Sequence, residues 1–166
     1  MAKFRAALKK CERMQVYVGV PQSKSGRTKG GVTNAELMFI HSNGSRLQNI
    51  PARPVIEPAI NAPEDKAAIT VELKKAAQSA FAGNAEEAKE YLDRAGLIGQ
   101  NAARKWFYDP RNNWPPDAPA TIARKTRKGR LNKNGDPAAA VARPLIDTGQ
   151  LQRAIVYVVV ENGESK

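Results

Sequence analysis

Two short runs of β-branched and apolar residues lie near opposite ends of the 166-residue sequence, Met14–Val20 and Ala154–Val160. Each run has the composition and length of a β-strand, and the first ends at Pro21. Because neither strand would be stable alone, we expect the two to pair in one small antiparallel sheet. A two-stranded sheet has open edges, to which a neighbouring subunit can add a strand.

The residues between these strands show helical patterns. A long helix is predicted from Pro63 to about Phe81, and a second one follows the cap residue Asn84. Along the second helix, small residues recur at steps of three and four, which suits close packing. This stripe consists of Ala88, Leu92, Ala95, Gly99 and Ala102. The sequence therefore predicts an α+β fold, in which two long helices pack with a small sheet.

Shorter helices are predicted at residues 2–13, 35–41, 55–60, 120–125 and 149–153. The helix over 35–41 is expected to be capped by Thr33 or Asn34 and to end at Gly44. The length is typical of one domain, so we expect a single domain over residues 1–166. Segments rich in Gly, Pro and polar residues predict long mobile loops at about 21–32 and 109–142.

The composition excludes several classes of protein. Cys11 and His41 are the only cysteine and histidine, which excludes an intramolecular disulfide and a Cys/His zinc cluster. The longest apolar run, Ile155–Val160, is far shorter than the ~20 residues that span a bilayer. The basic N-terminal segment lacks the apolar region of a secretory signal. We therefore expect a soluble protein of a reducing compartment, with no membrane contact, metal or cofactor.

The segment Leu145–Gly149 resembles the Asp-Thr-Gly signature of aspartic proteases, in which two such loops share a proton. Only 17 residues follow Gly149, too few for the rest of that fold. We interpret Asp147 and Thr148 as a helix cap, a role in which their side chains accept from free backbone N–H groups. The Gly-rich segment Gly26–Gly31 lacks the spacing of a phosphate-binding loop. No catalytic, metal-ligating or cofactor-binding set emerges, and we do not expect an enzyme.

Basic residues dominate the charge: 27 Lys and Arg against 16 Asp and Glu give a formal net charge of +11. Most of the excess lies in two blocks, Lys3–Lys29 and Arg104–Lys133. Such blocks attract polyanions or acidic protein surfaces, or they simply keep a protein soluble. The segment Arg124–Arg130 has no aromatic residue on which a base could stack, so it is more typical of a mobile basic loop than of a sequence reader.

The order of several motifs resembles a known family. A Gly-Val-Pro step at the end of the first strand is followed by a Gly-rich loop and by the segment Asn34–Ser45. Next come Ile50–Ile60 (IPARPVIEPAI), Ala118–Lys125 (APATIARK) and Pro144–Leu151 (PLIDTGQL). Over about residues 14–160, this order resembles the tail-component proteins, of the tail-completion and neck type, of tailed double-stranded DNA bacteriophages.

This resemblance implies a non-enzymatic virion protein at the neck or tail end, made in the host bacterial cytoplasm. The implied role is tail completion and head–tail joining, as part of a ring that is expected to be a hexamer. The implied partners are other copies of the chain, tail tube, tail terminator or head-connector proteins, and double-stranded DNA in the channel. A tail terminator or a head-side connector subunit is an alternative, and a basic nucleic-acid-binding protein is an alternative of another class.

Two sets of contact residues follow as hypotheses from this reading. A rigid inter-subunit contact is expected from the proline-rich segment, at Ile50, Pro51, Arg53, Pro54, Val55 and Ile56. Contacts with DNA or acidic neighbours are expected from the basic loops, at Arg27, Lys29, Arg124, Lys125, Arg127, Lys128 and Arg130.

Overall fold

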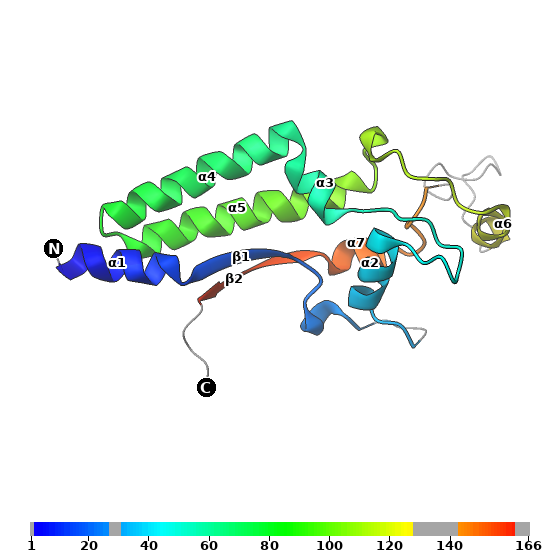
Figure 1. The fold of residues 1–166 in the computed structure, drawn as a ribbon, viewed down its shortest axis with the longest axis horizontal. Coiled ribbons are helices and arrows are strands. Elements are labelled where there is room, and N and C mark those ends of the chain that lie inside the picture. Colours follow the sequence, from blue (N-terminus) through cyan, green and yellow to red (C-terminus); the bar gives the residue numbers. More distant parts are fainter. Residues whose placement is uncertain (1, 27–30, 128–142, 162–166) are drawn as a thin grey trace. The chain divides into compact units, whose positions relative to one another are not determined.

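A computed structural model describes residues 2–26, 31–127 and 143–161 of the chain (Figure 1). The sequence analysis predicted one domain, whereas the contacts group the chain into two compact units. Unit 1 is built from Met1–Gly19, Ile56–Ala103 and Val156–Lys166, and unit 2 from Val20–Val55 and Arg104–Ile155. Each unit therefore contains segments that lie far apart in the sequence.

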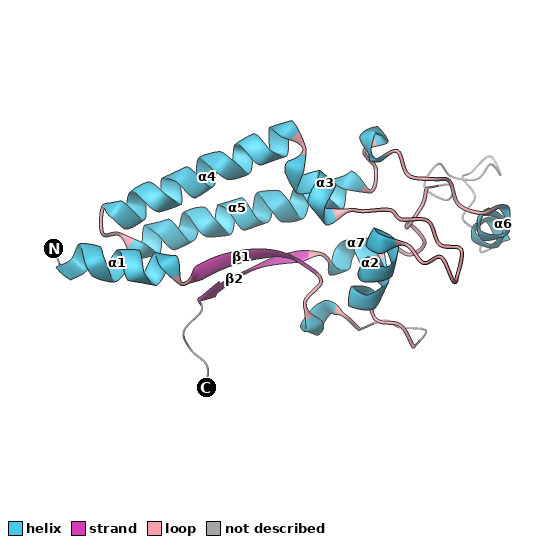
Figure 2. Ribbon diagram, in the orientation of Figure 1, coloured by secondary structure: helices cyan, strands magenta, loops and turns pink. Residues whose placement is uncertain are grey.

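The sheet of unit 1 consists of β1 (Met14–Gly19) and β2 (Val156–Glu161), as Figure 2 shows. The strands are antiparallel, with Met14 opposite Glu161 and Gly19 opposite Val156. The predicted small antiparallel sheet of an N-terminal and a C-terminal strand is confirmed. Its second strand begins two residues later than predicted, because the preceding residues up to Ala154 form a helix.

Helices α1 (Ala2–Glu12), α3 (Ile56–Asn61), α4 (Pro63–Phe81) and most of α5 (Ala85–Trp106) belong to unit 1. The two long helices have the predicted positions and lie side by side in Figure 1. The Asn84 side chain accepts a hydrogen bond from the backbone N–H of Glu87 at 3.3 Å, which confirms Asn84 as the cap of α5.

Glycines on α5 allow the sheet to approach the helix closely. A Cβ atom at Gly96 would lie 2.8 Å from Cγ of Tyr157 and 3.0 Å from Cγ1 of Val16. A Cβ atom at Gly99 would lie 3.0 Å from Cγ2 of Val18. Gly99 of the predicted stripe thus faces the sheet, together with Gly96, which was not part of that prediction. On the outer face, side chains remain exposed at Tyr17, Val158 and Val160.

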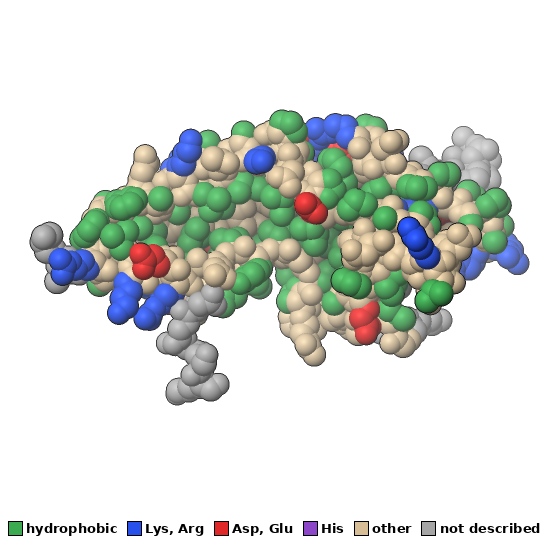
Figure 3. Space-filling model, in the orientation of Figure 1, with side chains coloured by type: hydrophobic (Ala, Val, Ile, Leu, Met, Phe, Trp, Pro, Cys, Tyr) green, Lys and Arg blue, Asp and Glu red, His purple; other side chains and the backbone are tan. Residues whose placement is uncertain are grey.

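Helix α1 packs along α4 near the turn between the two long helices. The rings of Phe4 and Phe81 are 6.4 Å apart, and Nζ of Lys10 lies 2.6 Å from Oε1 of Glu86. In Figure 3, basic side chains at the α1 end surround an acidic one. The basic residues of α1 therefore lie on a unit that also supplies acidic partners.

Unit 2 holds shorter elements joined by extended segments: the 3-10 turns η1 (Gln22–Lys24) and η2 (Pro110–Asn112), and helices α2 (Asn34–Asn43), α6 (Pro119–Arg127) and α7 (Gln150–Ala154). Thr33 and Glu36 form a reciprocal capping box at the start of α2. Gly44 ends the helix as predicted, but its φ of 73° and ψ of 176° are not the expected left-handed helical conformation. A Cβ there would lie 2.8 Å from the backbone N of Ala52.

The loop predicted over residues 109–142 is regular in its described part. Residues 109–127 contain η2, an extended run and α6, and several of their side chains are held by hydrogen bonds. The loop predicted over 21–32 contains η1, and the Asn34 side chain donates to the carbonyls of Lys24 and Gly26. Residues 27–30 and 128–142 of these predicted loops lie outside the described residues.

Candidate functional site

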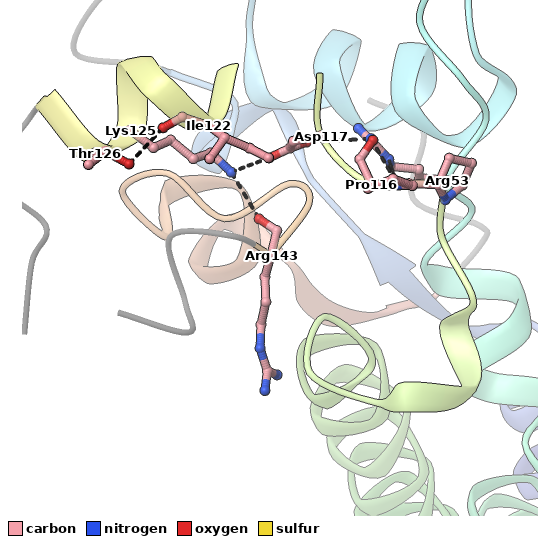
Figure 4. Close-up of polar contacts among 8 residues, drawn as sticks. Arg53, Pro116, Asp117, Ile122, Lys125, Thr126 and Arg143 are labelled. Atoms are coloured by element: carbon pink, nitrogen blue, oxygen red, sulfur yellow. Dashed lines mark hydrogen bonds and ion pairs between the residues drawn. The ribbon is translucent and has the colours of Figure 1, made fainter. Parts of the chain in front are cut away.

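A buried cluster of three charged side chains lies in unit 2 (Figure 4). Oδ2 of Asp117 is 2.6 Å from Nζ of Lys125, and Oδ1 is 3.4 Å from the guanidinium of Arg53. The three side chains are between 4 and 7% exposed. Two cations therefore share one carboxylate, and the remaining positive charge needs further acceptors.

Backbone carbonyls supply these acceptors. The Arg53 guanidinium donates to the carbonyls of Pro115 and Pro116 at 2.8 to 3.1 Å, and the Lys125 ammonium donates to the carbonyl of Arg143 at 2.9 Å. Charged donors make stronger hydrogen bonds than neutral ones. The cluster thus fastens four segments to one another: residues 50–54, residues 115–117, helix α6 and the residues after 142.

The cluster corrects part of the predicted inter-subunit contact. Arg53 and Val55 are 6% and 0% exposed, so both side chains hold the segment within unit 2 and neither is available to another subunit. Pro51 and Pro54 are exposed, and the predicted contact is still possible there. Ile50 is half-buried in unit 2, and Ile56 is half-buried as the first residue of α3 in unit 1.

A tight turn precedes this segment and was missed by the sequence analysis. The backbones of Ser45 and Ile50 exchange two hydrogen bonds of 2.8 Å, which close a short loop. Leu47 lies within the loop with a relative exposure of 101%. Asn49 has a positive φ of 52°, which asparagine adopts more readily than most residues. The loop therefore presents a large apolar side chain on a hydrogen-bonded frame.

Helix α2 presents a second exposed apolar side chain. Its residues 37–40 are Leu, Met, Phe and Ile, so apolar side chains occur on all sides of the helix. Only one side can face the interior, where Met38 is 7% exposed, and Phe39 is left 70% exposed. Hollows on both sides of Phe39 are lined by Val32, Ala35 and Met38, among others. Among its described residues, α2 thus leaves Phe39 as an exposed large apolar side chain.

The positive charge of the chain is divided unequally between the units. Over its full residue ranges, unit 1 has 11 basic and 11 acidic residues and is formally neutral. Unit 2 has 16 basic and five acidic residues, so it carries the whole net charge of +11. The first basic block of the sequence, Lys3–Lys29, is therefore divided between the units, because its first part belongs to α1 in unit 1.

The structure changes the set of basic contact residues. Lys125 is 3% exposed and paired with Asp117, so it is a structural residue and cannot contact DNA as predicted. Arg124 and Arg127 are exposed on α6, where Figure 3 shows basic side chains. The other predicted members, Arg27, Lys29, Lys128 and Arg130, lie outside the described residues.

The predicted cap at Asp147 and Thr148 is only partly correct. The residue that caps α7 is Gly149, which has a φ of 72° and, as a glycine, has no side chain to accept a cap hydrogen bond. The Thr148 hydroxyl accepts from the backbone N–H of Gln150 at 3.4 Å. Leu145, in the turn that precedes this segment, has a φ of 62°, which is uncommon for a residue other than glycine. The Asp-Thr-Gly segment thus forms a tight turn before a short helix.

The described residues contain no group of three or more His, Cys, Asp or Glu side chains that could hold a metal ion. Burial raises the pKa of the Cys11 thiol despite the nearby Lys10, which disfavours a reactive thiolate. No described helix is long and apolar enough to cross a membrane.

No family model, curated protein or solved structure matches the chain.

Proposed function

We propose that this chain is a non-enzymatic structural protein of a tailed bacteriophage, which acts in tail completion and head–tail joining as part of a ring. The proposal rests first on the sequence resemblance over residues 50–60 and 144–151. The single strongest structural support for the proposal is the Arg53–Asp117–Lys125 cluster. The bonds of this cluster join the segment 50–60 to Arg143, which directly precedes the segment 144–151. Tail terminator and head-side connector are narrower variants of the same proposal.

The exposed apolar side chains of unit 2 provide a surface for assembly. Leu47 and Phe39 are both large, exposed and carried on hydrogen-bonded backbone, so little conformational entropy is lost when they are covered. Contiguous apolar patches mark protein–protein contacts, and aromatic side chains such as Phe39 are enriched in them. We propose that these side chains, with Pro51 and Pro54, contact neighbouring subunits or tail proteins.

The role is tested in the virus that encodes the chain. Deletion of the gene is expected to give filled heads and separate tails in electron micrographs, and addition of the purified protein to restore joined particles. Complete, infectious particles formed without the chain would refute the proposal.

The contact surface is tested by light scattering on the purified protein at ~0.15 M and ~0.5 M salt, alone and with isolated tails or heads. We expect a ring, or a monomer that binds stoichiometrically to one particle end. Leu47→Asp is expected to abolish assembly or binding, while Leu73→Asp on α4, also at an exposed leucine, has no effect. Equal losses for both variants would contradict the assignment of the contact to unit 2.

A further inference from the structure

We infer that unit 2 binds the phosphate backbone of nucleic acid through a basic surface formed by Lys105, Tyr108, Arg124, Arg127 and Arg143. The inference does not depend on the phage assignment, because it concerns the isolated protein. Its starting point is the unequal charge of the units: unit 2 carries the whole +11 and unit 1 is neutral. Solubility alone gives no reason for such a separation, whereas a polyanion partner does.

The acidic side chains of unit 2 leave this charge largely uncompensated. Glu36 accepts hydrogen bonds from Thr33 in the cap of α2, and Asp109 is paired with Arg111 at 2.7 Å. Asp117 is buried between Arg53 and Lys125. Asp109 and Asp117 are thus paired with cations of unit 2, whereas Glu36 is exposed and keeps its charge at the start of α2.

The centre of the surface is the pair of Tyr108 and Arg143. The Arg143 guanidinium lies 5.1 Å from the centre of the Tyr108 ring and donates to the Tyr108 carbonyl at 3.2 Å. Figure 4 shows that the Arg143 side chain points away from the Lys125 ammonium, which its carbonyl accepts. Tyr108 is 46% exposed. The tertiary fold thus brings an exposed aromatic ring to an arginine 35 residues away, although the basic segment 124–130 has none of its own.

Helix α6 carries two further arginines of the proposed surface. Its buried Lys125 anchors the helix to Asp117 and to the carbonyl of Arg143, so α6 is fixed beside the central pair. Arg124 and Arg127 are exposed on this anchored helix. Lys105, also exposed, precedes Tyr108 by one helical turn, and its carbonyl accepts from the Tyr108 N–H. The planar guanidinium of arginine can bind two phosphate oxygens at once, which favours backbone recognition.

A simpler explanation covers some of these residues. Lys105 lies in the last turn of α5, and Arg124 and Arg127 lie in the last turn of α6, where cations stabilise the helix dipole. That explanation requires neither the Arg143–Tyr108 pair nor an excess of 11 charges on one unit. If these residues only stabilise their helices, their substitution should leave nucleic-acid binding unchanged, and this outcome can be measured.

The experiment measures binding of a mixed-sequence duplex of ~30 base pairs, and of the matching single strand, by fluorescence anisotropy from ~0.05 to ~0.3 M salt. The test variant is Arg124→Gln with Arg127→Gln. The control is Lys66→Gln with Lys74→Gln, which removes the same charge from exposed positions of unit 1. A third variant, Arg143→Gln, tests the centre of the surface. Circular dichroism shows whether each variant folds.

We expect the wild-type dissociation constant to rise steeply with salt, because cations are released from the nucleic acid. Each phosphate contact contributes about 0.9 to the logarithmic salt slope on duplex, so the α6 variant should lose about 1.8 from the slope and weaken roughly 60-fold at ~0.1 M salt. Arg143→Gln should lose about half as much slope, and the control variant should match wild type. Tighter binding of duplex or of single strand identifies which form of backbone is preferred.

Three results would overturn the inference. One is no binding at ~0.05 M salt. Another is equal weakening by the α6 and control variants, which would mean that only total charge matters. A third is equally tight binding of polyglutamate of the same charge, which would point to an acidic protein as the partner.

Discussion

Unit 1 and unit 2 reach stability by different physical routes. Unit 1 buries small apolar side chains of long helices against each other and against a sheet, and Ala88 on α5 is fully buried. Unit 2 has shorter elements, and its segments are fastened by a buried carboxylate with two cations and by charged donors on carbonyls. We therefore expect unit 1 to be sensitive to side-chain volume and unit 2 to be sensitive to charge.

The largest expected effect comes from removal of the central charge of unit 2. Asp117→Asn would leave Arg53 and Lys125 as buried cations without a carboxylate, so we expect the free energy of unfolding to fall by about 3–5 kcal/mol. The double variant Asp117→Asn with Lys125→Met removes one of these cations and should recover part of the loss. Urea denaturation measures both.

For comparison, Glu90→Gln breaks an exposed pair with Arg94 of unit 1 and should cost about 0.5 kcal/mol or less. Similar losses for the exposed and buried positions would remove the proposed difference between the units.

A smaller effect is expected when volume is added to unit 1. Gly96→Val would place side-chain atoms into the ring of Tyr157, which forces the sheet away from α5 and should cost about 2–3 kcal/mol. Gly19→Val is the matched control, since nothing lies within 4 Å of a Cβ at that strand position. Thermal and urea unfolding of the two variants compare them directly. Equal stability of the two would show that the close contact between sheet and helix is not required.

The smallest effect concerns pH. Arg111 donates from its side chain and backbone to Asp109 and lowers the pKa of that carboxyl from 3.8 to about 2. A carboxyl with a lowered pKa stabilises the fold above its ordinary pKa, and this contribution is lost as the pH falls from about 4 toward 2. A carboxyl-detected NMR titration should show this midpoint, and Arg111→Gln should move it up toward 3.8.

Salt sharpens the same comparison. In unit 1, the hydrogen bond and charge of Lys10 lower the pKa of Glu86, whose side chain is 78% exposed. Salt at ~1 M should largely remove this shift, because exposed pairs are screened, and should change the titration of Asp109 less, since its side chain is only 7% exposed. A titration of Asp109 that is as salt-sensitive as that of Glu86 would contradict the expectation that the Asp109–Arg111 pair is screened less by salt.

The sequence predicted the regular parts of the fold well, because their signals are local. The helical periodicity of the sequence and its cap residues predicted α4 and α5, and the composition of the two strands predicted the sheet. The division into two units was not predicted, since it depends on contacts between residues far apart in the chain.

The candidate site was predicted only in part. The segment around Arg53 was identified, but the direction in which this side chain points depends on Pro115 and Asp117, more than 60 residues away. Lys125 was predicted to contact DNA or acidic neighbours and Asp117 was not singled out, because nothing in their neighbouring residues indicates burial. The exposed Leu47 could have been noticed as an apolar residue among polar ones, between Arg46 and Gln48.

The pairing of β1 with β2 has a consequence for the order in which the chain folds during synthesis. β1 emerges from the ribosome early, but its partner strand is made only after residues 20–155. Until then, β1 has no partner strand, and the long connection adds an entropic cost to closure. Unit 2 ends at Ile155, so its residues are complete before those of unit 1. Unit 2 is therefore able to finish folding before unit 1, which is completed only by β2.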